Sequence, residues 1–267
     1  MENKFRVACF QTCSSDDPQE NFKMLDQIFN RIKNKSFDLI CLPECVSIFT
    51  DSKKIINNYI ENFHDHFINL MKEKAKFFGA NILIGSHPFK KKNEKFSNRS
   101  LLIDSSGNVI CYYDKINLFD VDLGKNESYL ESKNFDAGKF IKIANLPFGK
   151  LGMSICYDLR FPNLFKKLAK KGADFFSIPA AFTYTTGKSH WHTLIRARAI
   201  ENGCYVFAPA QCGTHKNGRK TFGHSLIVDP WGKILSEAKD DICFIDAVID
   251  KNLILNSRKR IPSMSSY

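Results

Sequence analysis

Short apolar runs recur along the whole chain, separated by segments that carry polar and apolar residues at helical spacing. Eight of these runs predict β-strands, because they are rich in Ile, Val, Phe and Leu. Several are apolar on both faces, which is typical of strands in a buried sheet. The predicted strands cover residues 5–11, 37–44, 80–86, 139–146, 150–156, 173–182, 204–211 and 242–250.

Four segments between these strands predict helices. The first places its apolar residues close to the 3.6-residue period, and the third has Pro162 in its first turn and Gly172 just past its end. The predicted helices cover residues 18–35, 55–78, 161–171 and 191–202. Because strands and helices alternate, the sequence predicts an α/β layered fold.

A weak internal repeat links the two halves of the chain. SLLIDSSGNVI (100–110) and SLIVDPWGKIL (225–235) both run from apolar residues through Asp and a turn with Gly to further apolar residues. Each predicts a β-hairpin. Two similar halves favour two sheets that face each other. No linker or low-complexity segment interrupts the chain, so we expect one domain over residues 1–267.

Composition narrows the class of protein. The 267 residues are 43% hydrophobic and 25% charged, with a formal net charge of +11. The lysines are scattered over polar segments and no RNA-binding aromatic motif or zinc-finger spacing occurs, so we expect solvated faces and no nucleic-acid partner. No apolar segment reaches the length of a membrane span, and the N-terminus has no signal-peptide core. Nine cysteines without a Cys-x-x-Cys pair indicate reduced thiols in a cytoplasmic protein.

Three residues with side chains suited to catalysis lie at the ends of predicted strands. Cys156 ends one strand just before a helix, where the helix N-terminus favours a thiolate nucleophile. Taken alone, such a cysteine is more often a core residue. Glu44 ends a second strand behind a proline, and partial desolvation there raises its pKa and suits a general base. Lys115 ends a hairpin strand and can stabilise an oxyanion. Strand ends are where sites assemble in α/β sheets.

The motifs around these residues resemble the nitrilase superfamily of carbon–nitrogen hydrolases. The resemblance rests on LPE (42–44), YDK (113–115), CYDLRFP (156–162), PAAFTYTTGKSHW (179–191), RARAIENGCYV (196–206) and GHSLIVDPWG (223–232). It implies a four-layer α-β-β-α sandwich of the nitrilase type, a homodimer, and chemistry without a metal or other cofactor. It also implies a Glu-Lys-Cys triad of Glu44 as base, Lys115 as oxyanion donor and Cys156 as nucleophile.

Further site residues follow from the same resemblance. Glu131, in YLES, is similar to the second glutamate of the family, with Glu127 as the rival position. The backbone N–H of Tyr157 is expected to share the oxyanion. The pocket for a substrate carboxylate is expected to contain Arg160, Phe182 and Thr186. The alternative role of Arg160 is an ion pair with Asp158.

Within the superfamily, the chain resembles the Nit-type amidases that act on α-keto acid amides. The segment AQCGTHKNGR (210–219) is more similar to the deaminated glutathione amidase branch than to the ω-amidase branch. The implied reaction hydrolyses the amide to a carboxylic acid and ammonia through a thioester. The alternatives are an ω-amidase acting on α-ketoglutaramate and a hydrolase of N-carbamoyl amino acids or aliphatic amides.

The sequence departs from the family pattern at His192, where the family usually has glutamate after His-Trp, and in the short tail after Pro262. We expect the helix that contains His192 to line the site or a dimer contact. Three rival functions remain open. They are a Cys–His hydrolase using one of the histidines that follow Cys156, a zinc site at His190-x-His192, and a binding protein on an inactive hydrolase fold. The histidines after Cys156 are His190, His192, His215 and His224.

Overall fold

Two six-stranded sheets form the centre of the protein. The computed structural model describes residues 3–92, 95–124 and 127–263. The first sheet contains, in spatial order, β16 (Cys243–Asp250), β1 (Lys4–Gln11), β2 (Leu39–Cys41), β3 (Asn81–Lys90), β4 (Phe96–Ile103) and β5 (Val109–Asp114). The second contains β15 (Ile234–Glu237), β14 (Leu226–Val228), β11 (Tyr205–Ala208), β10 (Phe175–Ser177), β9 (Gly149–Met153) and β8 (Lys142–Leu146).

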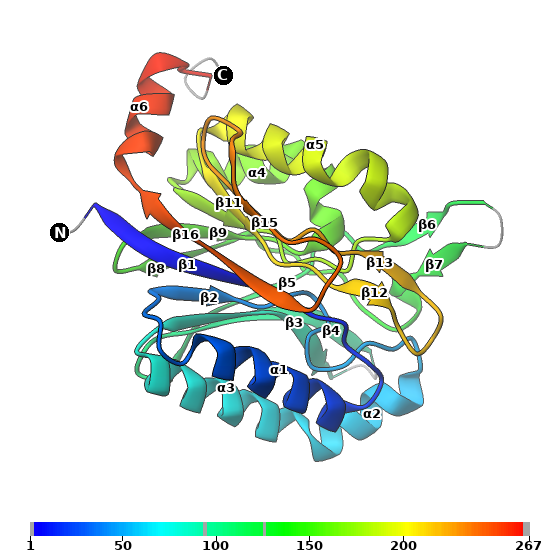
Figure 1. Cartoon of the computed structure of the whole chain (residues 1–267). Coiled ribbons are helices and arrows are strands. Elements are labelled where there is room, and N and C mark those ends of the chain that lie inside the picture. Colours follow the sequence, from blue (N-terminus) through cyan, green and yellow to red (C-terminus); the bar gives the residue numbers. More distant parts are fainter. Residues whose placement is uncertain (1–2, 93–94, 125–126, 264–267) are drawn as a thin grey trace.

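Helices cover the outer faces of both sheets. The helices are α1 (Pro18–Ile32), α2 (Lys53–Asn62), α3 (His64–Phe78), α4 (Pro162–Lys170), α5 (Tyr184–Asn202) and α6 (Asn252–Arg260). Figure 1 shows α1, α2 and α3 on the outer face of the first sheet and α4 and α5 on the outer face of the second. This arrangement confirms the predicted four-layer α-β-β-α sandwich. Among the described residues, no helix has the length and apolar character needed to cross a membrane.

The two halves of the chain have the same strand topology. In each sheet three parallel strands are followed by an antiparallel hairpin: β1, β2 and β3 precede β4–β5, and β9, β10 and β11 precede β14–β15. Each sheet also has one antiparallel strand beside its first parallel strand, β16 on β1 and β8 on β9. The hairpins predicted at 100–110 and 225–235 are therefore confirmed.

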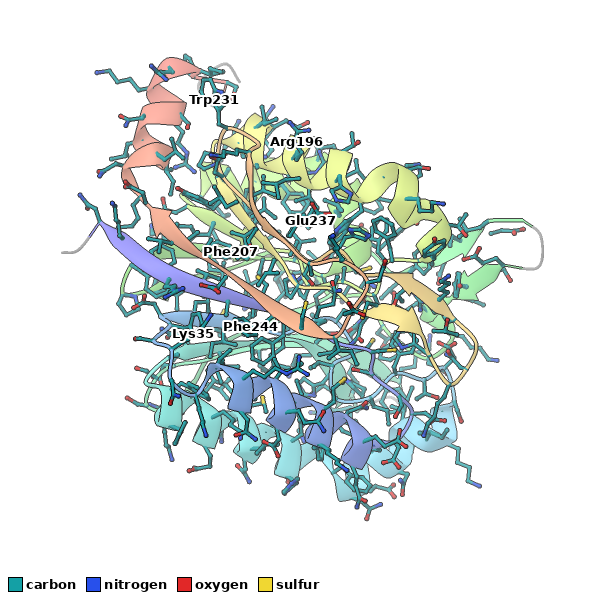
Figure 2. All side chains as sticks on the ribbon, in the orientation of Figure 1. Lys35, Arg196, Phe207, Trp231, Glu237 and Phe244 are labelled. Carbon is teal, nitrogen blue, oxygen red and sulfur yellow. The ribbon has the colours of Figure 1, made fainter. Side chains whose placement is uncertain are left out.

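Strand β1 explains why several runs are apolar on both faces. Its residues Val7 and Cys9 pack between the two sheets, while Ala8 and Phe10 pack under the helices. On the neighbouring strand β16, Phe244 contacts the helical layer, and the Lys35 ammonium that follows α1 lies 4.7 Å from its ring (Figure 2). Both faces of β1 are thus buried, which explains why its sequence is apolar at consecutive positions.

Two helix predictions were wrong in their bounds. The segment 55–78 is not one helix, because it divides at Phe63 into α2 and α3. At Phe63 the backbone leaves the helical conformation, with φ −130°, and the phenyl ring packs against the core. At the same end of α2, the Asn62 side chain donates a hydrogen bond to the Asn58 carbonyl. Helix α5 begins at Tyr184, seven residues before the predicted start at 191, because Thr183 provides the extended N-cap residue.

Two small hairpins, which the sequence did not predict, extend from one end of the sandwich. They consist of β6 (Asp120–Asp122) with β7 (Ser128–Leu130) and of β12 (Cys212–Thr214) with β13 (Lys220–Phe222). Two 3₁₀ turns, η1 (Glu131–Lys133) and η2 (Cys156–Arg160), lie in the same chain segments as the predicted site residues. Figure 1 shows both hairpins projecting from the same end of the sheets.

Candidate active site

Glu44, Lys115, Glu131 and Cys156 line one cavity of about 280 Å³. The predicted strands 37–44 and 150–156 are shorter in the structure, because β2 ends at Cys41 and β9 ends at Met153. Glu44 and Cys156 therefore lie three residues beyond the ends of their strands, outside the regular strand pairing of the sheets. Lys115 directly follows β5. Loops beyond strand ends converge at the same edge, which brings these distant residues together.

Lys115 is a buried cation held between two carboxylates. Its Nζ lies 2.8 Å from Glu44 Oε1 and 2.9 Å from Glu131 Oε2, with only 2% of its side chain exposed. Burial lowers the pKa of Lys115, but the charges of Glu131 and Glu44 outweigh burial and raise it well above its usual value. An ammonium has three N–H donors, so two are used here and one remains for a ligand in the cavity.

Glu131, rather than Glu127, is the second glutamate in contact with Lys115. Besides Lys115, the Glu131 carboxylate accepts the backbone N–H of Phe119 at 2.6 Å. Glu127 instead accepts hydrogen bonds from Tyr129 and Thr185. The geometry therefore favours Glu131 of the two positions left open by the sequence.

Asn98 joins the two glutamates and was missed by the sequence analysis. Its Nδ2 donates to Glu44 Oε1 at 3.0 Å and to Glu131 Oε1 at 2.9 Å. Asn98 lies in β4, within the polar run Ser-Asn-Arg-Ser that interrupts an otherwise apolar strand. A buried polar residue at such a position signals a hydrogen-bond network, and that signal was present in the sequence.

Cys156 lies in a strained turn and lines the same cavity as Glu44. Cys156 has φ +46°, a left-handed conformation that is uncommon for residues other than glycine, and its N–H donates to the Pro179 carbonyl at 2.9 Å. The Glu44 carboxylate is close enough for its charge to raise the pKa of the Cys156 thiol, and both residues line the same cavity. The strained backbone thus places the thiol in the cavity that also contains the candidate base.

The expectation of a thiolate stabilised by a helix N-terminus was wrong. Helix α4 begins at Pro162, six residues after Cys156, and a 3₁₀ turn lies between them. Burial and the Glu44 charge raise the pKa of the Cys156 thiol well above its usual value. The thiol is therefore protonated at neutral pH, and a neighbouring base must remove its proton before it can attack.

The expected upward shift of the Glu44 pKa was also wrong. Burial does raise the pKa of this carboxyl, but the charge of Lys115 and its hydrogen bond lower it further, so the net pKa lies below the usual value. The Ala181 N–H also donates to Glu44 Oε2 at 2.8 Å. Glu44 is consequently a carboxylate at neutral pH, which is the form that accepts a proton.

Arg160, Tyr157, Phe182 and Thr186 line a small recess that opens beside Cys156. The Arg160 guanidinium lies 5.1 Å from the Phe182 ring centre and 3.2 Å from His190 Nδ1. The alternative ion pair between Arg160 and Asp158 is wrong. Asp158 is fully buried and its carboxylate accepts hydrogen bonds from Tyr113 at 2.7 Å and from the Asn117 side chain at 2.8 Å.

The histidines lie outside the cavity within the described part of the chain. His215 is buried between Ser14 and Thr221, and no histidine lines the cavity or its recess among those residues. The Cys–His rival therefore has no base to use. The nitrogen atoms of His192 and His224 and a carboxylate oxygen of Glu237 lie within 4.8 Å of one another, so these three residues, rather than His190 with His192, have the geometry to hold a metal. Figure 2 shows Glu237 on the face of the second sheet next to α5.

This fold and this cavity agree with a known enzyme family. The sequence profile of the carbon-nitrogen hydrolase family matches residues 6–256, so the chain belongs to that family and is a hydrolase of amide carbon–nitrogen bonds. A deaminated glutathione amidase of Yersinia enterocolitica is 36% identical over 259 residues, which is 96% of this chain and 90% of the relative.

Two solved structures have the same fold. Nit3 of Saccharomyces cerevisiae, described as a member of branch 10 of the nitrilase superfamily, is 31% identical with a TM-score of 0.86 and is aligned over 97% of this chain and 94% of its own. The NitFhit protein of Caenorhabditis elegans is 34% identical with a TM-score of 0.93 over 99% of this chain. The present chain covers 65% of that longer protein. The resemblance to the nitrilase superfamily is thus confirmed.

Proposed function

We propose that this enzyme hydrolyses the amide bond of a small α-keto acid amide, with deaminated glutathione as its principal substrate. The observation that carries the proposal is the Lys115 ammonium held between Glu44 and Glu131 beside the Cys156 thiol. This arrangement supplies a nucleophile, a base and an oxyanion donor in one cavity. Two relatives that match 96% and 98% of this chain carry the name deaminated glutathione amidase.

The first half of the reaction forms a thioester. Glu44 takes the thiol proton while the Cys156 sulfur attacks the amide carbonyl. The oxyanion that forms is stabilised by the third N–H of Lys115 and by the backbone N–H of Tyr157. One such donor lowers the barrier by about 3 kcal/mol. The tetrahedral intermediate collapses as Glu44 returns the proton to the departing nitrogen, and the acyl group stays on the sulfur.

The second half releases the acid. Glu44 takes a proton from water, whose oxygen attacks the thioester carbonyl, and the sulfur leaves to recover its proton from Glu44. Glu131 acts through Lys115, because it fixes the ammonium without contacting the carbonyl. The chain's own residues carry every proton transfer, and none of these steps calls on a cofactor.

The nature of the amine product corrects the expectation of ammonia for the principal substrate. Glutathione has its γ-amide on the nitrogen of cysteine, so hydrolysis of the deaminated form releases cysteinylglycine. Ammonia is the product only for unsubstituted amides such as α-ketoglutaramate. The assay must therefore detect the dipeptide or the α-keto acid and not ammonia alone.

Arg160 is suited to bind the carboxylate of the keto acid portion of the substrate. Both α-keto acid amides carry a carboxylate beside the keto group, and the planar two-pronged guanidinium of Arg160 suits that carboxylate. Phe182 and Thr186 complete this recess. If the enzyme prefers an α-keto acid amide to an N-carbamoyl amino acid or an aliphatic amide, that result will support this role of Arg160.

The decisive test compares four substrates on the purified protein: deaminated glutathione, α-ketoglutaramate, a simple aliphatic amide and an N-carbamoyl amino acid. The highest kcat/KM is expected on deaminated glutathione. Preference for α-ketoglutaramate would assign an ω-amidase with the same triad. Cys156→Ser is expected to lose turnover while its melting temperature stays near that of the wild type, and near-native activity in that variant would reject the mechanism.

We also propose that the enzyme works in the cytoplasm as a homodimer of single-domain chains spanning residues 1–267. All nine cysteines are free thiols, which supports a reducing compartment. Exposed apolar side chains such as Ile200 and Trp231 support a contact between copies. Light scattering on the purified protein tests the dimer, limited proteolysis tests the single domain, and microscopy of a tagged chain tests the location.

A further inference from the structure

Arg219 stands where three hollows of the molecule meet. It follows the turn of the β12–β13 hairpin, which projects from the same end of the sandwich as β6–β7 (Figure 1). Among the described residues, it alone lines the catalytic cavity, the recess around Arg160, and an outer hollow of about 440 Å³. Its charge reaches Glu44, whose pKa it helps to lower after the larger effects of burial and Lys115.

Aromatic rings and one carbonyl hold the Arg219 guanidinium in place. Its central carbon lies 4.6 Å from the Tyr129 ring centre, 5.3 Å from Phe49 and 5.6 Å from Phe119. Its Nη2 donates to the Ala181 carbonyl at 2.8 Å. Stacking on rings restricts the guanidinium to one plane, and a donor fixed in advance loses little freedom when an anion binds.

The guanidinium has hydrogen-bonding capacity that the protein does not use. Its Nε is buried and has no hydrogen-bond partner among the described residues. Within residues 3–92, 95–124 and 127–263, no carboxylate lies at ion-pair distance from Arg219. A partly buried cation with a free donor is costly unless an anion completes it. The missing partner is therefore expected to come from outside the chain.

We propose that Arg219 binds a carboxylate on the amine side of the substrate, that is, on the leaving group. This inference rests on the proposed function, and it specifies the substrate class as an α-keto acid amide whose amine portion ends in a carboxylate. For deaminated glutathione that group is the glycine carboxylate of cysteinylglycine. Ammonia, the leaving group of α-ketoglutaramate, offers nothing for Arg219 to bind.

The assignment of the two arginines follows from what must happen to each half of the substrate. The acyl half stays bonded to Cys156 after the first step, so it stays in the cavity that Cys156 lines, with its keto-acid carboxylate toward the recess of Arg160. The amine half must depart before water attacks, so it belongs on the side that opens outward. Arg219 lines that outer hollow and Arg160 does not.

The acidic groups of the outer hollow narrow the position of the carboxylate. Asp51 and Glu127 both line the hollow, and either would repel an anion placed at its rim. Glu127 accepts hydrogen bonds from Tyr129 and Thr185, and Asp51 lies 3.5 Å from the Asn217 amide. The carboxylate is therefore expected to bind the Arg219 guanidinium away from Asp51 and Glu127, where Nε has no partner among the described residues.

The test is the ratio of kcat/KM on deaminated glutathione to kcat/KM on α-ketoglutaramate, measured for the wild type, Arg219→Met and Arg219→Lys. Loss of one hydrogen-bonded charge pair corresponds to about a tenfold to hundredfold fall in this ratio for Arg219→Met. Arg219→Lys keeps the charge without the fork and is expected to lie between the two. Lys216→Met is the matched control, because Lys216 lies on the same hairpin but pairs at the surface with Glu20. It is expected to keep the wild-type ratio.

A modified substrate supplies the second half of the test. Deaminated glutathione with its glycine carboxylate converted to a carboxamide should lose on the wild type about the factor that Arg219→Met loses on the free acid. The same modification should change little in Arg219→Met, because the interaction is already absent. If Arg219→Met loses equally on deaminated glutathione and on α-ketoglutaramate, the ratio stays unchanged, the proposal is overturned, and Arg219 is assigned to holding Ala181 beside Glu44. Wild-type kcat/KM on both substrates in Arg219→Met would overturn the proposal as well.

An error in the proposed function itself would give a different result from an error in the role of Arg219. If the wild type hydrolyses neither α-keto acid amide, the function is rejected before any variant is compared. Calorimetric binding of cysteinylglycine to the wild type and to Arg219→Met then decides the anion site alone. Binding that depends on Arg219 supports the site, and binding that is absent or independent of Arg219 rejects it.

Discussion

Gly85 controls the position of Glu44, although it lies on a different strand. Gly85 is in β3, at the irregularity where the pairing of β3 with β4 shifts register. The backbone of Leu42 and Pro43 lies directly against it, and the Pro43 carbonyl accepts the N–H of Ser86 at 3.2 Å. The segment that carries Glu44 is therefore seated on a position without a side chain.

The substitution Gly85→Ala is expected to displace Glu44. A Cβ at this position would lie 2.0 Å from the Leu42 carbonyl oxygen, about 1.4 Å closer than the 3.4 Å at which ordinary contact begins. All of the nearest atoms belong to the backbone of Leu42 and Pro43, so no flexible side chain can move away to make room. A shift of about 1 Å breaks the 2.8 Å contact between Glu44 and Lys115, and misplacement on this scale costs about a hundredfold in rate.

The assay is kcat/KM on the preferred amide together with the free energy of unfolding in urea. Gly85→Ala is expected to lose about a hundredfold in kcat/KM and about 1–3 kcal/mol of stability from overpacking. Gly79→Ala is the matched control. Gly79 has φ +58° with open space around it, so alanine there costs stability without moving the site. A Gly85→Ala enzyme with wild-type kcat/KM would refute the reasoning.

Three further perturbations test the charges around the cavity and in the core. Asn98→Ala removes the shared donor of Glu44 and Glu131, so kcat/KM is expected to fall about tenfold or more in steady-state assays. Lys115→Met leaves two carboxylates without their cation and is expected to lower the free energy of unfolding by about 3–5 kcal/mol in urea titrations. Burial lowers the pKa of His87 to about 3, so the unfolded chain gains a proton between pH 6.5 and 3 that the folded chain does not. The contribution of neutral, buried His87 to the free energy of unfolding is fully present above pH 6.5 and falls by about 1.4 kcal/mol per pH unit between pH 6.5 and 3. His87→Gln should therefore flatten the pH dependence of the melting temperature.

Separate controls apply to these variants. Asn98→Ala must melt near the wild-type temperature, since a large loss of stability would explain lower activity without the network. Combining Lys115→Met with Glu131→Gln should recover part of the lost stability, because one uncompensated charge is removed. A His87→Gln protein with the pH dependence of the wild type would show that other groups, such as His215, whose pKa burial lowers to about 4, dominate the acid limb.

The apolar runs and the motifs of this chain were sufficient to predict its layered fold and to select Glu44, Lys115 and Cys156, which the structure places around one cavity. Strands that are buried on both faces carry their signal in local composition, and β1 shows why, with alternate residues in two different cores. The paired hairpins at 100–110 and 225–235 were visible as a repeat of turn residues. Such signals are local, so the sequence alone was sufficient for them.

The electrostatics of the site depended on the tertiary structure. The sequence could place Glu44 at a strand end, but whether its pKa rises or falls depends on how close Lys115 comes from 71 residues further along the chain. The same holds for Cys156, whose thiol is governed by burial and by Glu44 instead of by the helix that follows it.

Only the folded chain decided which residues complete the site. Gly85 and Arg219 act through contacts with segments remote in sequence, and no local pattern distinguishes them from an ordinary strand glycine or a surface arginine. The polar run around Asn98 indicated a hydrogen-bond network, but only the fold shows that Asn98 joins Glu44 to Glu131. Helix α5 likewise begins at Tyr184, after the extended N-cap residue Thr183, and the apolar period of the helix does not encode this start. Local propensity determines which elements form, whereas the packing of one sheet against the other determines which side chains meet.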